Sequence, residues 1–180
     1  MKSFLSRRAF CAGAAPLLLL PNALWAQDLP DCEGQLEDGS QANLRRLTEG
    51  KAVALQFVFT TCVTLCPLMG ALFRAVQRDL DATAREGCLL LSVSVDPEHD
   101  TPSKLRRFLE KNQAEAGWRA LLLARLDLDR LLLALGEEAS SPTLHSPQTI
   151  VFDRRGAESA RFRELGKAPE IAQALRAAAR

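Results

Sequence analysis

The chain has 180 residues, of which 47% are apolar and 25% are charged, so it can bury the core of one domain. The formal net charge is only +1, which argues against a nucleic-acid partner, since such a partner needs a basic face. Aromatic residues are few and Tyr is absent, so nothing indicates a surface on which bases stack.

The N-terminus predicts an export signal. Basic residues precede an apolar stretch over 11–20, and Ala26 ends a candidate cleavage site. The segment SRRAF at 6–10 resembles the twin-arginine export motif of bacteria. We therefore expect a cleaved leader at 1–26, a single domain at 27–180 and a periplasmic location. The alternative is an uncleaved N-terminus that anchors the protein to the inner membrane, although the apolar stretch is shorter than the ~20 residues of a membrane span.

The elements after the leader alternate between strands and helices. Polar residues over 28–38 predict a loop, and Asp38-Gly39 predicts a tight turn. Alternating elements predict an α/β fold with a central, mostly parallel sheet, helices on both faces, and a C-terminal β-hairpin plus helix. The expected strands lie at 52–60, 89–95, 118–123, 149–153 and 159–163, and the expected helices at 68–84, 101–116, 126–135 and 169–180.

Cys62 and Cys66 lie in the loop between the first apolar strand and its helix, and Pro67 suits the first helical turn. A helix N-terminus stabilises negative charge, so it lowers a thiol pKa and favours thiolate, the form that attacks disulfides and binds metals. A structural disulfide is the alternative. Closing so short a loop would gain little stability, so we favour a functional pair.

His145 is a candidate third ligand, because it lies in the 139–147 loop that precedes the strand at 149–153. If this strand runs parallel to the strand at 52–60 and close to it, His145 can face the cysteines. Two thiolates and one imidazole form a soft site that suits copper. A lone histidine in a loop is more often solvated, so the argument depends on its position relative to the cysteines.

Three segments carry a resemblance to a known family. The sequences FVFTTCVTLCP at 57–67, SVDPEHDTP at 94–102, and His145-Ser146 followed by TIVFD at 149–153 resemble the Sco/SenC proteins. The resemblance extends from about Gly34 to the C-terminus. One departure is Val63, where the family often has Pro. Another is the leader, which reads as cleavable whereas many family members keep a membrane anchor.

The Sco/SenC resemblance implies a thioredoxin-like fold with an inserted element. It also implies one copper ion, Cu(I) or Cu(II), held by Cys62, Cys66 and His145. Family members help to deliver copper to the binuclear copper centre of cytochrome c oxidase, or keep the cysteines of that centre reduced. We therefore predict a copper metallochaperone whose partner is a cytochrome c oxidase subunit or a related exported copper protein.

Two other functions are compatible with the cysteine pair. A thiol–disulfide oxidoreductase would use Cys62 and Cys66 to reduce a target protein, although such enzymes usually separate their cysteines by two residues. This alternative would make the chain an enzyme. A peroxidase-like function is weaker, because no arrangement of Thr or Arg points to peroxide activation.

Other polar residues near the motifs have two interpretations each. Asp96 and Asp100 either orient His145 or simply form a turn and a helix cap, and the second interpretation is preferred. His99 is either an extra ligand or a solvated side chain.

The remaining cysteines and arginines complete the set. Cys88 is expected to be a small buried hydrophobe, while Cys32 can pair with Cys88, link two chains or stay free. Four arginines are expected on solvated faces or against an acidic partner: Arg106, Arg107, Arg161 and Arg163.

Overall fold

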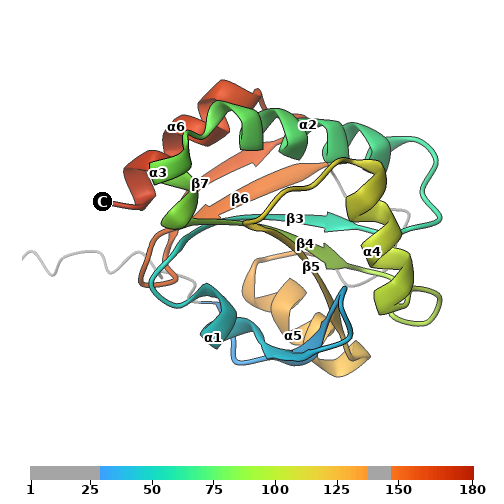
Figure 1. Cartoon of the computed structure of the whole chain (residues 1–180). Coiled ribbons are helices and arrows are strands. Elements are labelled where there is room, and N and C mark those ends of the chain that lie inside the picture. The colour runs from blue at the N-terminus through green and yellow to red at the C-terminus, as the bar shows by residue number, and fades with distance from the viewer. Residues whose placement is uncertain (1–28, 138–146) are drawn as a thin grey trace, which may run out of the picture.

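The sheet and helices of this protein form a layered α/β fold, shown in Figure 1 as a computed structural model that describes residues 29–137 and 147–180. One seven-stranded sheet has the order β2-β1-β5-β4-β3-β6-β7. The strands are β1 (Glu33–Leu36), β2 (Gln41–Asn43), β3 (Ala52–Val58), β4 (Cys88–Ser94), β5 (Trp118–Leu123), β6 (Gln148–Phe152) and β7 (Glu158–Arg163). The helices are α1 (Leu44–Thr48), α2 (Leu65–Asp79), α3 (Ala82–Glu86), α4 (Pro102–Lys111), α5 (Arg125–Ala134) and α6 (Ala168–Ala178).

The sheet is mixed, and parallel pairing is confined to its three central strands. β3 pairs parallel with β4, and β4 pairs parallel with β5. Every residue of β3 and β4 is buried, which explains their continuous apolar runs. The outer pairs are antiparallel, including β3 with β6 and β6 with β7. The expected α/β class and the C-terminal hairpin with its helix are confirmed, whereas a mostly parallel sheet is not what these pairings form.

Helices cover both faces of the sheet and enclose two separate apolar cores (Figure 1). On one face, α2, α4 and α6 bury Phe73, Leu105 and Ile171 against the sheet. On the opposite face, α1 and α5 bury Leu44 and Leu131. The alternation of side chains along each strand divides the apolar residues of the strands between these two cores.

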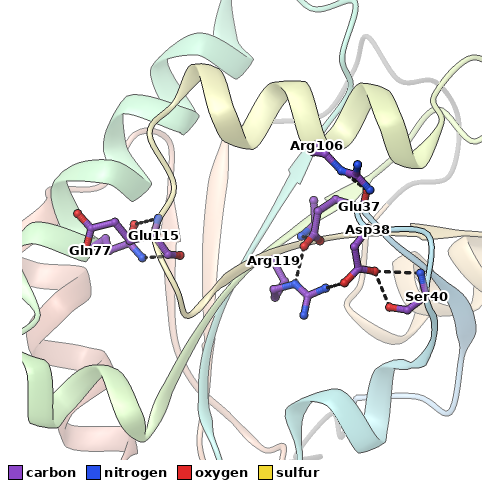
Figure 2. Close-up of polar contacts among 8 residues, drawn as sticks. Glu37, Asp38, Ser40, Gln77, Arg106, Glu115 and Arg119 are labelled. Carbon is purple, nitrogen blue, oxygen red and sulfur yellow. Dashed lines mark hydrogen bonds and ion pairs between the residues drawn. The ribbon is translucent and has the colours of Figure 1, made fainter.

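The N-terminal hairpin is a feature that the sequence pattern did not reveal. Residues 33–36 form β1 where a loop was expected, residues 41–43 form β2, to which no element was assigned, and the predicted turn at Asp38-Gly39 joins them. Both strands are short and polar, so they carry no hydrophobic periodicity. Tertiary contacts hold the turn: Arg119 on β5 forms ion pairs with Glu37 (2.6 Å) and Asp38 (2.7 Å), and Arg106 donates to the Glu37 carbonyl (Figure 2).

Two helices end earlier than the apolar spacing predicted. α2 ends at Asp79 because the extended backbone of Leu80 breaks it, and the Asp81 side chain then caps the separate helix α3. α4 ends at Lys111, where Asn112 forms the C-cap and Gln113 has a positive φ of 55°. Its predicted start is confirmed, since the Thr101 hydroxyl accepts from the Lys104 N–H (3.3 Å) and Pro102 follows.

The α2 and α4 helices approach closely near the end of α4. A Cβ atom at Gly70 of α2 would collide with the Asn112 side chain, so glycine permits this approach. Further along α2, the Gln77 side chain exchanges hydrogen bonds with the backbone of Glu115 (Figure 2). Within the described ranges, no helix is both long and apolar enough to cross a membrane.

Candidate functional site

The cysteine loop connects the buried strand β3 to the start of α2. β3 ends at Val58, α2 begins at Leu65, and Cys66 lies in the first turn of that helix. Pro67 follows at a position where a missing N–H leaves no helical hydrogen bond unmade. Cys62 and Cys66 are therefore both held at the helix N-terminus, as the sequence predicted, and both are free thiols.

Cys62 lies within the loop between β3 and α2, and its side chain is partly exposed. The Cys66 backbone N–H donates to its Sγ at 3.3 Å. Partial burial raises the pKa of Cys62, but hydrogen bonds from the backbone N–H groups of Cys66, Thr64 and Leu65 and from the Cys66 thiol outweigh burial, so the pKa lies below its ordinary value. Cys62 is thus the thiolate-forming member of the pair.

Cys66 lies deeper, with only 6% of its surface exposed, and packs in the core beneath α2. The Phe59 N–H donates to its Sγ at 3.5 Å. Burial is the main cause that raises the pKa of Cys66 to about 12, and the neighbouring Cys62 and Asp100 also favour the protonated thiol, whereas the Phe59 N–H acts in the opposite direction. The two thiols therefore differ strongly in their readiness to ionise.

Asp100 anchors the cysteine loop from the segment that leads into α4. Its side chain is buried and accepts hydrogen bonds from the Thr60 N–H (3.2 Å) and from the Ser94 hydroxyl (2.6 Å). The Thr60 hydroxyl also donates to it. Asp100 thus ties the end of β4 to the start of the loop, a contact that links residues 40 positions apart. It acts neither as a helix cap nor as a partner of a described histidine.

The predicted ligand His145 lies outside the described residues. The parallel pairing that was the condition for His145 to face the cysteines is not what the structure shows, because β6 pairs antiparallel with β3 and Gln56 lies opposite Thr149. The antiparallel direction places the start of β6, at Gln148, beside the carboxyl end of β3 that leads to the cysteines. A parallel strand would instead have begun beside the first residues of β3, far from the end that leads to the cysteines.

A cavity of about 520 Å³ opens beside the two cysteines, between the cysteine loop and α4. Phe59 and Phe108 contribute apolar surface to it, and Lys104, Arg107 and Lys111 contribute positive charge. The sequence did not predict this cavity. Arg107 alone of its cationic residues was named, as an arginine on a solvated face or against an acidic partner. The signal available in the sequence was the spacing of the four α4 residues, which places them on one helix face.

The other candidate residues near the site have structural partners. His99 is exposed, and its Nδ1 lies 2.8 Å from an Asp96 carboxylate oxygen. The hydrogen bond to Asp96, followed by the charge of Asp96, raises the pKa of His99. Neither residue contacts a cysteine in the described part of the chain, so the preferred interpretation of a local turn is supported.

Cys32 and Cys88 are buried in cores on opposite faces of the sheet, so the alternative in which they pair with each other is excluded in this fold. Cys88 is the small buried hydrophobe that was expected. The Cys32 thiol donates to the Asp127 carbonyl at 3.4 Å. Burial raises the pKa of Cys32 to about 11 and also raises that of Cys88.

Arg161 does not lie on a solvated face, contrary to expectation. Only 14% of its side chain is exposed, and it forms ion pairs with Glu137 and Glu158, both at 2.7 Å. It also donates to the Leu135 carbonyl (3.0 Å) and the Gln148 side chain (3.3 Å). Arg161 therefore joins the end of α5 to the start of β6.

The described residues supply two soft donors and no complete metal site. No group of three or more His, Cys, Asp or Glu side chains within residues 29–137 and 147–180 could hold a metal ion. Two thiols at a helix start can ionise, bind a soft metal ion together with a further ligand, or form a disulfide. The donor set thus fits a soft metal ion, provided that another residue completes the site.

The fold and the paired cysteines define a thioredoxin-like α/β protein with a CxxxC pair at a helix start. The sequence model of the SCO1/SenC family matches residues 36–117, which contain the cysteine loop and the segment at 94–102. The resemblance to the Sco/SenC family predicted from the sequence is therefore confirmed.

Two curated relatives are similar in sequence. A SCO1 protein homolog of Bacillus subtilis is 38% identical over 74 residues, which cover 41% of this chain and 37% of the relative. A protein of Stutzerimonas stutzeri, named as a candidate copper-binding protein, is 31% identical over 122 residues, which cover 68% of this chain and 57% of that one. The chain thus spans about a third to somewhat over half of the length of these relatives.

A solved structure confirms the fold over most of the chain. The copper-bound ScoI of Bradyrhizobium japonicum matches with a TM-score of 0.68 and 17% identity, covering 83% of this chain and 98% of that one. At this identity, the likeness establishes the common fold, including the sheet that carries the cysteine loop.

Proposed function

We propose that this protein binds one copper ion through Cys62, Cys66 and His145 and delivers it to an exported copper protein. The observation that carries the proposal is the placement of Cys62 and Cys66 at the start of α2, where backbone N–H groups favour the Cys62 thiolate. Two copper-related proteins among its relatives, one named for copper binding and one solved with copper bound, support the choice of metal.

His145 is proposed as the third ligand because of the strand that follows it. It precedes the first residue of β6, Gln148, by three positions, and this end of β6 lies beside the end of β3 that leads to Cys62. An imidazole adds a ligand that copper accepts in either oxidation state. Copper is here the cargo, and the protein's residues bind it, shield it and release it.

We further propose a binuclear copper centre of cytochrome c oxidase as the destination. The family resemblance carries this step. The proposed leader at 1–26 would export the chain to the periplasm, where it would act either as a free domain at 27–180 or anchored by an uncleaved N-terminus.

The test is a Cu(I) titration of the reduced full chain against a chromophoric chelator. We expect one tightly bound ion, and an affinity lowered by more than about 100-fold in Cys62→Ser and Cys66→Ser, since direct ligands contribute more than the residues that orient them. His145→Ala should also bind more weakly. The chain has only two histidines, so His99→Ala is the matched control and should bind as the parent does.

The titration can also contradict the proposal. Tight binding by His145→Ala would exclude the three-ligand set. Equal weakening by His99→Ala would show that the loss is not specific to the proposed site. The absence of tight copper binding in the parent would exclude the copper function.

A second candidate, reduction of cysteines in the target copper protein, is favoured by the unequal pKa values of the two thiols. The Cys62 thiolate would attack a target disulfide, and the departing target sulfur would take up a proton. The Cys66 thiol, losing its proton, would then attack Cys62 Sγ and release the second target thiol. The target gains two electrons and two protons, and the protein is left with a Cys62–Cys66 disulfide. Rapid reduction of a disulfide probe by the reduced chain, without copper binding, would favour this candidate.

A further inference from the structure

The cavity beside Cys62 has a cationic wall that the proposed copper site does not use. Lys104, Arg107, Phe108 and Lys111 reach the cavity from one face of α4, at helical spacings of three and four residues. Among the described residues, the other side chains that line the cavity are neutral and none is acidic. The wall therefore attracts anions toward the thiol pair.

Two of these cations are available to a ligand. The Lys104 ammonium donates to the His99 carbonyl at 2.6 Å, which holds it in place. Arg107 and Lys111 are exposed, and neither forms an ion pair within the described parts of the chain. They lie four residues apart, so their Cα atoms are separated by a rise of about 6 Å along the helix. Carboxylates two residues apart in an extended segment have a similar spacing of roughly 6–7 Å.

Exposed apolar side chains follow Cys62 along the chain, in the cysteine loop and in the first turn of α2. Val63 is 87% exposed, Leu68 51% and Leu65 37%, and these three residues lie within six positions of one another. Exposed apolar groups that gather at one place commonly mark a protein interface, whose buried centre is apolar and whose rim is polar. A small anion would have no use for this apolar surface, whereas a protein segment would cover it.

We propose that Arg107 and Lys111 of the cavity wall, together with the exposed Val63 next to Cys62, dock an acidic segment of the protein that exchanges copper or electrons with Cys62. The inference deepens the proposed function and rests on it for the existence of such a partner. Carboxylates of the segment bind Arg107 and Lys111, and an apolar side chain of the segment packs on Val63. This arrangement brings the partner's own thiols to the partly exposed Cys62.

The test is the rate at which the reduced full chain reacts with a peptide disulfide. The probe is the symmetric disulfide of a short peptide with one Cys, a Leu and a Glu-Ala-Glu segment, compared with the same peptide carrying Gln for both Glu. In the reaction, the Cys62 thiolate attacks one peptide sulfur and displaces the other as a thiolate. Cys66 then displaces the remaining peptide, so each disulfide yields two peptide thiols and one protein disulfide.

We expect the acidic peptide to react at least about 10-fold faster than the neutral one at low ionic strength, because the cations concentrate it near Cys62. This ratio should approach one at 1 M salt, where the Debye length is about 3 Å. Arg107→Gln/Lys111→Gln should lose most of the ratio. Arg45→Gln/Arg46→Gln is the matched control and should keep it, because it removes two exposed charges from α1 on the opposite face of the sheet.

Three results would overturn the docking proposal. One is an unchanged ratio in Arg107→Gln/Lys111→Gln. Another is an equal loss in the Arg45→Gln/Arg46→Gln control, which would reveal an effect of net charge alone. The third is an equal advantage for a small dianionic aromatic disulfide together with no effect of Val63→Ser, which would assign the cavity to small anions. The assay contains no copper, so its outcome is separate from that of the copper titration.

Discussion

The cysteines of the described structure fall into two regions with opposite chemistry. Cys32 and Cys88 lie in the two apolar cores, where burial raises the pKa of each thiol. Cys62 lies at the start of α2, where N–H groups lower its pKa despite partial burial. The residue type is the same in both regions. The difference shows that hydrogen-bond donors at a helix start, rather than the presence of cysteine, make this site reactive.

Cys66 shares features of both regions. It belongs to the helix start, yet it is buried beneath α2 and its pKa is raised to about 12. The pair therefore combines an accessible thiolate with a buried thiol. The difference between the two regions can be tested at individual residues of each.

The largest expected effect is on alkylation of the reduced chain. The pKa of Cys32 is about 11 and that of Cys62 lies below its ordinary value, so at pH 7 iodoacetamide should modify Cys62 at least about 100-fold faster. Cys88 should react as slowly as Cys32, because it is also buried. Peptide mass spectrometry over time measures the three rates. Modification of Cys32 or Cys88 at a rate within tenfold of Cys62 would remove the distinction between the regions.

The next effect is on the stability of the loop that carries the reactive cysteine. Asp100→Ala removes the acceptor of hydrogen bonds from the buried Ser94 hydroxyl and from the partly buried Thr60 N–H. We expect the free energy of unfolding to fall by about 2–3 kcal/mol in urea denaturation. Glu98→Ala in the same turn is exposed and should change it by less than about 0.5 kcal/mol. Equal effects of the two substitutions would contradict the anchoring role of Asp100.

A smaller effect distinguishes a core cysteine from a site cysteine. Cys88→Ala removes one buried sulfur and should lower the free energy of unfolding by about 1 kcal/mol, the scale of one buried methylene group. Copper affinity should remain at the parent value, since Cys88 lies away from the cysteine loop at the start of β4. A loss of copper binding in this folded variant would mean that Cys88 serves the site.

The smallest expected effect is the displacement of the Cys62 titration. The folded-state pKa is lowered, so the thiolate persists to lower pH than in the unfolded chain, and protonation on acidification suppresses the reaction. The midpoint of the rate of alkylation against pH should therefore lie below that of the same residue in 6 M guanidinium chloride. Coinciding midpoints would show that the α2 start does not stabilise the thiolate.

The sequence predicted the chemistry of the cysteine loop better than it predicted its surroundings. The placement of Cys62 and Cys66 could be predicted because an apolar strand, a proline and a helical pattern are local signals. β1 and β2 could not, because their seven residues are mainly polar and contacts such as Arg119 with Glu37 define them. The direction of β6 relative to β3 could not be predicted either, because the residues of a strand do not encode the orientation of the neighbouring strand.

The cavity with its cationic wall could not be predicted from local sequence patterns either. It forms because α4 packs beside a loop that lies some forty residues earlier in the chain, with Asp100 bound to Thr60 at the junction. The spacing of Lys104, Arg107 and Lys111 identifies a helix face, but only the fold shows that this face lies beside Cys62.

The most direct test of the central claim is X-ray absorption spectroscopy at the copper edge of the reduced full chain carrying one equivalent of Cu(I). The account predicts two sulfur ligands and one imidazole nitrogen in the parent, with the imidazole signal lost in His145→Ala and retained in His99→Ala. Sulfur ligands alone in the parent, or an imidazole signal that persists in His145→Ala, would contradict a site built from Cys62, Cys66 and His145.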